Sequence, residues 1–259
     1  MLSLSNVSKR FSTSRHDTTA LNDISFEIRK GEFICVVGPS GCGKSTLLNL
    51  IAGLDKATSG TLTFEGKPVK GPGADRVVVF QEAALYPWLN VRANVEFGLK
   101  MKGVPAKERK GIVDRYLELV NLHNSQRAFV HELSGGMKQR VQIARALAVE
   151  PDMLLMDEPF AALDAQTRDA LQLELQDIWT RTGSTIFFIT HNVREAALLA
   201  DRVLVMTPSP GAIKAEIPVA LQRPRHPDTH AVVDYAAEIR NALQHTDYHR
   251  STADTVYAI

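Results

Sequence analysis

Residues 38–45 read Gly38-Pro39-Ser40-Gly41-Cys42-Gly43-Lys44-Ser45, the pattern G-x-x-x-x-G-K-S of a phosphate-binding loop, or P-loop. The apolar run Phe33 to Val37 precedes this loop, and a helical pattern from Lys44 to Ala52 follows it. A strand before the loop and a helix after it are the context in which the motif binds phosphate. A dinucleotide-binding loop has the spacing G-x-G-x-x-G, whereas the glycines here fall as G-x-x-G-x-G. The sequence therefore favours a P-loop over that alternative and over a plain glycine-rich turn.

The residue types in this loop suit the binding of a nucleotide. Glycines allow the backbone N–H groups to turn toward an anion, and the N-terminus of the following helix adds its positive dipole. Lys44 can reach the outer phosphates, and the Ser45 hydroxyl can ligate Mg²⁺. The residues expected to bind nucleotide here are Gly38, Pro39, Ser40, Gly41, Cys42, Gly43, Lys44, Ser45 and Thr46.

Length and composition limit the remaining possibilities. The chain has 259 residues, 44% of them hydrophobic, which suffices for one sizeable core or a core with a subdomain. The net charge of +1 provides no bulk field that would attract nucleic acid or anionic lipid. Cys35 and Cys42 lack the spacing of metal ligands and indicate a reduced, cytosolic chain. Met1 to Arg10 has no apolar signal-peptide region, and no apolar stretch reaches the length of a membrane span.

Predicted strands and helices alternate along most of the chain. We expect strands at residues 2–7, 24–28, 33–37, 61–64, 77–80, 153–156, 185–189, 202–206 and 212–217. We expect helices at residues 44–52, 91–98, 106–120, 135–149, 165–182, 193–200 and 231–243. Residues 12–19 are polar and predict a loop. This alternation predicts an α/β fold with a mostly parallel sheet.

The middle of the chain has a different character, because no convincing strand occurs between Leu85 and Val149. This stretch predicts a helical insertion near the lower end of independent domain sizes. We therefore expect an α/β core formed by residues 1–84 and 151–220, a helical subdomain at 85–150, and a C-terminal tail at 221–259.

Polar residues follow four of the predicted strands, at the point where each strand ends. They are Gly38, Gln81, the pair Asp157 and Glu158, and His191. Ligands of parallel α/β sheets bind outside the carboxyl ends of the strands, so these residues are expected to face one phosphate site. One such residue would be an ordinary end to a strand, whereas four together form a constellation.

The two carboxylates of this set predict separate roles. Asp157 follows the apolar run Met153 to Met156, where a carboxylate can hold the hydration shell of Mg²⁺. Glu158 is placed to orient or deprotonate an attacking water. The alternative is that one of the two is a helix cap or an ion-pair partner. His191 alone would be a structural histidine, but beside the others it predicts a contact to the γ-phosphate.

A second candidate anion site lies inside the helical stretch. Residues 133–140 read Leu133-Ser134-Gly135-Gly136-Met137-Lys138-Gln139-Arg140. A serine and two glycines that open a helix can bind an anion, or can form a simple helix cap. Because the chain has one P-loop, a second phosphate site suggests that two chains, arranged head to tail, share their nucleotides.

Taken together, these motifs resemble the ATP-binding subunit of an ABC transporter over residues 1 to about 207. In that family the matching motifs are called Walker A (38–45), the Q-loop (Gln81), the signature (133–137), Walker B (153–158), the D-loop (Ala162-Leu163-Asp164) and the switch histidine (His191). Met137 replaces the commonest glutamine of the signature. That change removes one polar contact and leaves Ser134, Gly135 and Gly136 intact.

The resemblance implies a fold, an activity and a set of roles. The fold would be a RecA-like P-loop NTPase core with an N-terminal antiparallel β subdomain and an inserted α-helical subdomain. The activity would be ATP hydrolysis with Mg²⁺. The implied catalytic residues are Lys44, Gln81, Glu158 and His191; the implied metal ligands are Ser45, Gln81 and Asp157. Leu133, Ser134, Gly135, Gly136 and Met137 would act on the partner's nucleotide, Asp164 would serve the D-loop, and Phe11 would stack on adenine. Without the resemblance, the sequence favours Phe11 as a core residue of an edge strand.

A finer resemblance is to the nitrate, sulfonate and taurine importers, carried by residues 81–91, 133–141, 156–168 and 223–225. It implies a homodimer of ATPase subunits at the cytoplasmic face of the cell membrane, bound to permease subunits and served by an extracytoplasmic substrate-binding protein. The transported solute would be a small oxoanion or an organic sulfonate. A soluble ABC ATPase that acts on nucleic acid or ribosomes is the alternative, but the near-neutral charge disfavours it. A P-loop kinase outside this family would not need residues 133–140.

The loop of residues 83–89, named the aromatic loop below, follows Gln81 almost directly. It is apolar and carries Leu85, Tyr86 and Trp88, although its proline and its position after a strand predict a surface loop. We expect these three residues to contact a short helix of the permease. The alternative is that they pack against the helical insertion.

Overall fold

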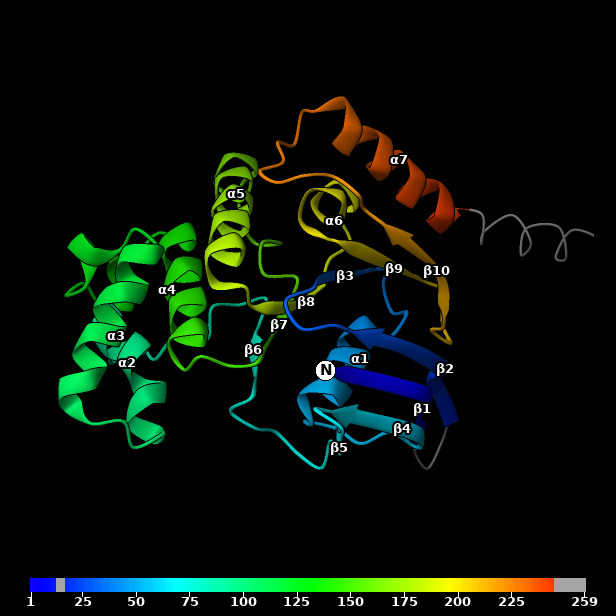
Figure 1. Cartoon of the computed structure of the whole chain (residues 1–259), viewed down its shortest axis with the longest axis horizontal. Helices are drawn as coiled ribbons and strands as arrows, with labels where there is room; N and C mark the ends of the chain where they lie inside the picture. The colour runs from blue at the N-terminus through cyan, green and yellow to red at the C-terminus, as the bar shows by residue number, and fades with distance from the viewer. Residues whose placement is uncertain (13–16, 245–259) are drawn as a thin grey trace, which may run out of the picture. The chain divides into compact units, whose positions relative to one another are not determined.

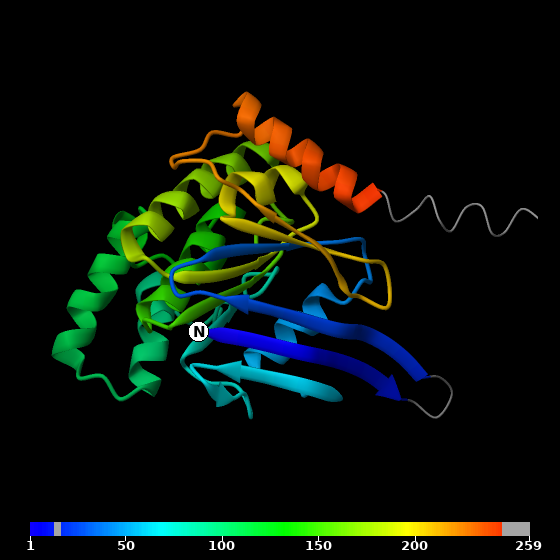
Figure 2. The same ribbon diagram turned by 45° about the vertical axis from the view of Figure 1, so that its right-hand side comes forward.

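The computed structural model describes residues 1–12 and 17–244, and it divides into two compact units. Unit 1 combines Met1–Pro72 with the chain from Phe187 onward. Unit 2 is Gly73–Ile186. Figures 1 and 2 show the elements of both units from two sides. The subdomain limits expected from the sequence, at residues 84, 150 and 220, stay predictions.

The N-terminal part of unit 1 is an antiparallel sheet of four strands in the order β2-β1-β4-β5. Its strands are β1 (Leu2–Ser12), β2 (Asp17–Ile28), β4 (Ser59–Phe64) and β5 (Lys67–Pro68). Leu2 pairs with Ile28 and Leu4 with Phe26, and all four side chains are buried, as alternation along a half-buried strand requires. The expected N-terminal antiparallel sheet is therefore present.

One sequence prediction in this sheet is wrong. The loop expected at residues 12–19 ends before Asp17, because β2 begins there and Thr18 pairs with Phe11. Polar side chains suggested a loop, but an exposed hairpin end carries polar side chains as readily. Residues 13–16 lie outside the described residues.

The second layer of unit 1 contains the strand that leads into the P-loop. Its strands are β3 (Phe33–Val37), β8 (Thr185–Ile189, of which the last three residues belong to this unit), β9 (Arg202–Met206) and β10 (Ile213–Pro218). β3 pairs with β9 in parallel, β10 pairs with β9 antiparallel, and the order is β10-β9-β3-β8. Every residue of β3 is buried, as expected of a strand covered on both faces.

The helices of unit 1 are α1 (Lys44–Ala52), α6 (Val193–Leu199) and α7 (His230–Gln244). α7 packs against α6 and β9 through Val232, Ala236 and Ile239, and Figure 1 shows it lying beside α6. The described part of the C-terminal stretch is thus packed on unit 1. The helix predicted at residues 231–243 is confirmed with slightly wider limits.

Unit 2 contains two parallel strands and a group of helices. The strands are β6 (Arg76–Val79) and β7 (Met153–Asp157). The helices are α2 (Val91–Met101), α3 (Ala106–Leu119), η1 (His123–Ser125), η2 (Val130–Glu132), α4 (Gly135–Ala148) and α5 (Ala165–Thr182). α2, α3 and α4 pack on one another, as Figure 1 shows.

The strand predicted at residues 77–80 is shifted by one residue, because β6 ends at Val79 and the Phe80 side chain is 44% exposed. An unbroken apolar run does not show where the strand turns away from the sheet. In the described residues, no helix combines the length and the apolar character needed to cross a membrane.

Candidate nucleotide-binding site

The P-loop joins buried β3 to α1, as the sequence predicts. Two of its glycines have left-handed backbone torsions, Gly41 with φ of 74° and Gly43 with φ of 98°. A β-carbon at Gly43 would lie 2.8 Å from the carbonyl oxygen of Ala20 and 2.7 Å from Leu21 Cδ2. Gly43 is therefore required both for its torsion and for the close approach of β2, and the loop can direct its N–H groups toward an anion.

Lys44 lies at the start of α1 and is 7% exposed. Its Nζ donates to the carbonyl oxygens of Gly38 at 2.9 Å and Pro39 at 3.1 Å. The loop backbone thus holds the ammonium group within the loop itself. A cation fixed beside inward-turned N–H groups is the arrangement that binds the outer phosphates of a nucleotide.

The two cysteines near the loop are buried thiols. Burial raises the pKa of the Cys42 thiol, and the nearby Lys44 opposes that rise without cancelling it. Burial also raises the pKa of Cys35, to well above its ordinary value, with the charge of Glu195 adding to the effect. Both side chains are therefore neutral thiols near pH 7.

Gly211 is a residue of this site that the sequence interpretation missed. A β-carbon on Gly211 would overlap the carbonyl oxygen of Cys42. Its N–H donates to the Ala20 carbonyl at 2.9 Å, and its own carbonyl accepts from the Asn22 N–H at 2.8 Å. The turn before β10, which the sequence identifies only as a turn, therefore lies against the P-loop. Nothing in the local sequence could reveal a contact between segments so far apart.

His191 follows β8 in unit 1. The Thr190 N–H donates to the carbonyl of Val36 at 3.2 Å, so the end of β8 lies beside the end of β3, where the P-loop begins. Asn192 caps α6 by accepting from the Arg194 N–H at 3.0 Å. His191 is exposed between these two anchored residues. Unit 1 thus brings the strand end that carries His191 next to the strand end that carries the P-loop.

Phe11, the expected adenine contact, lies near the end of β1. Its side chain is 43% exposed, and Lys9 Nζ lies 4.8 Å from the centre of its ring. Lys9 Nζ is in turn 2.6 Å from the carboxylate of Asp55. An exposed aromatic ring is thus present in unit 1, and its stacking on adenine stays a prediction.

The carboxylates Asp157 and Glu158 lie at the end of β7 in unit 2. Met153 to Met156 are buried, whereas Asp157 and Glu158 are half-buried. Glu158 has a left-handed backbone with φ of 44°. That conformation costs a non-glycine residue about 1–3 kcal/mol, and such strain concentrates at functional sites. The strain supports the interpretation of Glu158 as a residue placed for chemistry.

The signature residues lie at the start of α4, where the sequence allows either an anion site or a simple helix cap. The Ser134 hydroxyl caps the helix by accepting from the Met137 N–H at 3.3 Å. Gly135 is exposed, whereas Gly136 is buried, and a β-carbon at Gly136 would lie 2.7 Å from Thr167 Cγ2 of α5. The helix cap is thus observed, and the exposed N-terminus keeps the geometry of an anion site.

Asp164 of the D-loop lies beside the signature within unit 2. It caps α5 by accepting from the Thr167 N–H at 2.9 Å, and this hydrogen bond lowers the Asp164 pKa. Leu163 Cδ2 lies 3.4 Å from the position of a β-carbon on Gly135. Unit 2 therefore brings the signature and the D-loop together.

Gln81 is exposed just after β6. The carbonyl of the preceding residue, Phe80, accepts a hydrogen bond from Gln142 of α4 at 3.2 Å. Ser45, Gln81 and Asp157 offer a hydroxyl, an amide and a carboxylate oxygen, the hard donors that Mg²⁺ prefers. The residues present therefore fit the ion by their chemistry.

The sequence leaves two alternatives for the aromatic loop, namely contact with a permease helix or packing against the helical insertion. Its residues differ in this respect. Leu85 is buried at 8% exposure, Tyr86 is half-buried, and Trp88 is 71% exposed. The Tyr86 ring lies between Phe97, at 4.4 Å between ring centres, and Trp88, at 5.6 Å. Leu85 packs inside unit 2, while Trp88 extends to the surface.

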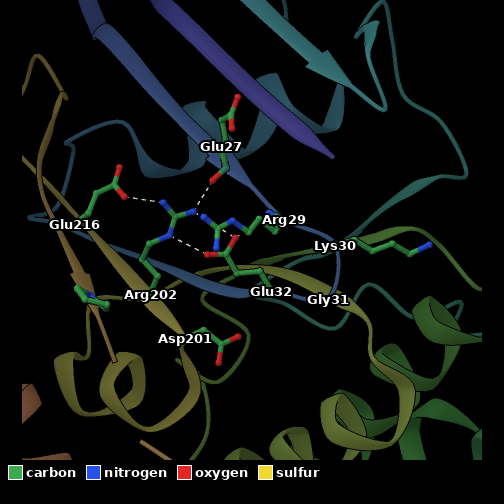
Figure 3. Close-up of a pocket in the computed structure, with 9 residues that line it drawn as sticks. Glu27, Arg29, Lys30, Gly31, Glu32, Asp201, Arg202 and Glu216 are labelled. Carbon is green, nitrogen blue, oxygen red and sulfur yellow. Dashed lines mark hydrogen bonds and ion pairs between the residues drawn. The ribbon is translucent and has the colours of Figure 1, made fainter. Parts of the chain in front are cut away.

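A polar pocket of about 800 Å³ lies around Arg202, the first residue of β9. Figure 3 shows the Arg202 guanidinium between Glu216 and Glu32, at 2.6 Å and 2.9 Å respectively. Burial lowers the Arg202 pKa, but the bonds to Glu32 and Glu216 outweigh burial and raise it. Arg202 thus pairs with two of the carboxylates that line the pocket, and we assign these ion pairs a structural role.

Unit 1 contains a buried strand, a loop with left-handed glycines, and a helix whose lysine points into that loop. These three features define a P-loop nucleotide-binding protein. Residues 21–161 match the model of the ABC transporter family. The nitrate import ATP-binding protein of Synechocystis is 52% identical over 85% of this chain and 83% of its own length. The taurine import ATP-binding protein of Roseobacter denitrificans is 49% identical over 83% of this chain and 81% of its own length.

A solved structure agrees with these sequence matches. It is a dimeric ATP-binding cassette in a post-hydrolysis state with ADP and Pi, and it is similar to this chain with a TM-score of 0.74 at 31% identity. The match covers 86% of this chain and all of that one. The chain therefore belongs to the ABC transporter family. The fold, the nucleotide and the ATPase activity expected from the resemblance are confirmed.

Proposed function

We propose that this chain is the ATP-hydrolysing subunit of an ABC importer that takes up a small oxoanion or an organic sulfonate through a separate permease. The relatives named as nitrate and taurine import proteins support this substrate class. They favour an importer over the alternative, a soluble ATPase acting on nucleic acid or ribosomes. The near-neutral net charge of +1 points the same way.

The observation that carries the transport role is the exposed aromatic loop beside an apolar groove, both in unit 2. The groove has a volume of about 450 Å³ and is lined by α2, α4 and β6. Phe97, Met101 and Val149 supply apolar surface, and Met101 is 70% exposed. A groove of this kind beside an exposed tryptophan suits an amphipathic helix anchored by aromatic contacts. The occupant we propose is a short cytoplasmic helix of the permease.

The roles in ATP hydrolysis follow the motif residues. Lys44 binds the outer phosphates, and Glu158 orients and deprotonates the attacking water. Gln81 and His191 contact the γ-phosphate region, so that Gln81 links the nucleotide to the aromatic loop. When Mg²⁺ is bound, it offsets phosphate charge; Ser45, Gln81 and Asp157 would hold the ion or its water.

Two copies of the chain would form the active assembly. Residues Leu133 to Met137 of one copy would complete the nucleotide site of the other, with Asp164 near the junction. Ser134 and Gly135 are exposed at a helix N-terminus, which supports this arrangement. The dimeric cassette with ADP and Pi supports it further. Phe11 would stack on the adenine ring, because its ring is exposed on β1.

The remaining expectations follow from this role. The chain would lie at the cytoplasmic face of the cell membrane and would receive its solute indirectly from an extracytoplasmic substrate-binding protein. Residues 1–84 and 151–220 would act as the ATPase core, 85–150 as the signature subdomain, and 221–259 as a C-terminal tail.

The test combines permease capture with transport. The tagged chain is expressed in cells that lack the native copy, captured from detergent-solubilised membranes and analysed for a co-purifying permease by mass spectrometry. The same cells are assayed for uptake of nitrate, taurine and an alkanesulfonate. Trp88→Ala should reduce permease recovery and uptake far more than the ATPase activity of the isolated subunit, because Trp88 is an exposed anchor.

Val233→Ala is the matched control, since Val233 is an exposed apolar residue of α7 in unit 1. It should leave permease recovery at the wild-type level. Equal permease recovery by wild type and Trp88→Ala would reject the proposed contact. Wild-type cells that take up none of the three solutes in an ATP-dependent way would reject the proposed substrate class.

A further inference from the structure

The aromatic loop is fixed to α2 by one buried side chain, that of Asn94. Asn94 is fully buried, at 0% exposure, one turn into α2. Its Oδ1 accepts from the Tyr86 N–H at 2.9 Å. Its Nδ2 lies 3.2 Å from the Tyr86 carbonyl oxygen, and 3.1 Å from those of Leu89 and Asn90. One amide therefore contacts the backbone at both ends of the segment that presents Trp88.

The chemistry of this contact requires an asparagine. The side chain accepts from one N–H, and the two hydrogens of its Nδ2 are shared among three carbonyl oxygens; an amide offers this acceptor and these donors on one short stem. A carboxylate could accept from Tyr86 but would face three carbonyl oxygens with no hydrogen to donate. A leucine would remove the Asn94 side-chain partner of the Tyr86 N–H and of the Leu89 carbonyl, and the loss of such a partner is costly. The carbonyls of Tyr86 and Asn90 would keep the N–H groups of Leu89 and Asn94 as donors.

Other contacts of the aromatic loop act beside those of Asn94. Within the loop, the Leu89 N–H donates to the Tyr86 carbonyl at 3.1 Å. Arg145 of α4 holds the start of the loop by donating to the Ala84 carbonyl at 2.8 Å, and its guanidinium lies 5.4 Å from the centre of the Tyr86 ring. Trp88 itself is exposed. The backbone from Tyr86 to Leu89 is thus held by the Asn94 side chain together with the hydrogen bond between Leu89 and Tyr86.

We propose that Asn94 is the positioning residue of the partner-docking surface: it holds the Tyr86–Asn90 backbone in the conformation that presents Trp88 to the permease. This inference rests on the proposed function for its biological role, whereas the ordering of the loop does not. A partner that binds a preformed loop avoids the entropy cost of ordering it, so loss of Asn94 should weaken capture without removing any contact residue.

The test measures the order of the aromatic loop and the binding of the permease separately. The chain contains two tryptophans, so Trp179→Phe leaves Trp88 as the single reporter. In that background, Asn94→Ala should lower the fluorescence anisotropy of Trp88 in the isolated subunit. Permease recovery should fall by about tenfold, because binding must then re-order the loop. Asn94→Asp is the second variant. It preserves the shape of the side chain but removes its N–H donors, so it should also lower the Trp88 anisotropy and the permease recovery.

Val95→Ala is the control for a merely structural effect. Val95 is the neighbouring residue of α2 and is fully buried, and its truncation destabilises the helix packing while it keeps the Asn94 amide that bonds the aromatic loop. The proposal requires that Val95→Ala keep the Trp88 anisotropy and permease recovery of wild type at temperatures where each variant is folded. If Asn94→Ala and Asn94→Asp keep wild-type anisotropy and recovery, the positioning role is overturned.

The two proposals fail in different ways. If wild type recovers no permease while Asn94→Ala still lowers the Trp88 anisotropy, the importer proposal fails and the loop-ordering role of Asn94 stands. If wild type recovers permease and the Asn94 variants do so equally well with unchanged anisotropy, the role of Asn94 fails and the importer proposal stands.

Discussion

Arg225 provides the sharpest test of the packing in unit 1. Its side chain is 3% exposed, and its guanidinium donates to five backbone carbonyl oxygens, with no carboxylate in this set. The shortest bonds reach Ala200 at 2.6 Å and Leu221 at 2.8 Å. The others reach Val219, Ala197 and Leu198. Burial lowers the Arg225 pKa to about 10, so the group stays charged near pH 7.

Three of these carbonyls lie at the C-terminus of α6, where a helix leaves carbonyls unpaired and carries a partial negative charge. Replacing Arg225 with methionine preserves bulk but leaves buried carbonyls without donors. Hydrogen bonds to charged groups contribute about 1.5–3 kcal/mol each, and they are not additive. A loss of about 3–5 kcal/mol is therefore expected, the range for breaking a buried charged contact.

The expected change is measurable by thermal unfolding. For a chain of this size, 1 kcal/mol corresponds to about 2–4 °C in Tm, so Arg225→Met should lower Tm by roughly 6–20 °C. The Tm of Arg225→Lys should fall between those of wild type and Arg225→Met, since an ammonium group carries three donors without the planar fork of a guanidinium. Differential scanning calorimetry and urea unfolding on the same variants would measure both Tm and the free energy of unfolding.

Arg240→Met is the matched control, because Arg240 is exposed on α7. Its expected effect is within about 0.5 kcal/mol, typical of surface changes. The reasoning fails if Arg225→Met unfolds with a free energy within about 1 kcal/mol of Arg240→Met. It also fails if Arg225→Lys matches wild type, because a point charge would then suffice.

Three further predictions concern catalysis and pH. Lys44→Ala should abolish ATP hydrolysis and weaken ATP binding, since Lys44 supplies the P-loop's own cation; wild-type turnover in the purified variant would refute this. Glu158→Gln should keep ATP binding, stop turnover and accumulate as a dimer in size-exclusion chromatography with ATP and Mg²⁺; a monomer at high concentration would count against the shared site. The Arg92 guanidinium, 2.6 Å from Asp114, lowers the Asp114 pKa. This ion pair should stabilise the folded chain by about 0.5–1 kcal/mol relative to Asp114→Asn. The stabilisation should be fully present above about pH 5 and lost as pH falls through the lowered Asp114 pKa. Urea unfolding that shows an equal difference in stability at pH 2.5 and pH 7 would contradict this prediction.

Features predicted well from the sequence are those whose physical cause is local. The P-loop depends on glycine torsions and on a lysine within eight consecutive residues, so its pattern predicts its geometry. The cap of α5 by Asp164 and the end of that helix at Gly183 are likewise local, and the predicted limits of residues 165–182 are those observed. The hairpin start at Asp17 and the exposed Phe80 were predicted incorrectly, since side-chain polarity alone does not locate the turn of a strand.

Features that the sequence could not predict depend on backbone groups far away. Gly211 reads as a turn residue, but its lack of a side chain matters because of Cys42 in the P-loop. Arg225 belongs to the stretch 223–225 that carries the finer resemblance, but nothing in that stretch indicates that it bonds to carbonyls of α6. Asn94 reads as a polar position on a helix, although it is fully buried. In each case the partner is a backbone group, and a backbone group leaves no trace in residue identity.

Glu158 shows how a motif residue depends on such hidden contacts. Its identity follows from the motif, but its left-handed backbone does not, since residue type encodes that torsion reliably only for glycine. The turn that follows Glu158 is closed by the Ala161 N–H, which donates to the Glu158 carbonyl at 3.1 Å. Arg168 of α5 then donates to the carbonyls of Phe160 and Leu163. The segment that follows the proposed catalytic carboxylate is therefore held by an arginine ten positions after Glu158, which no catalytic motif would select.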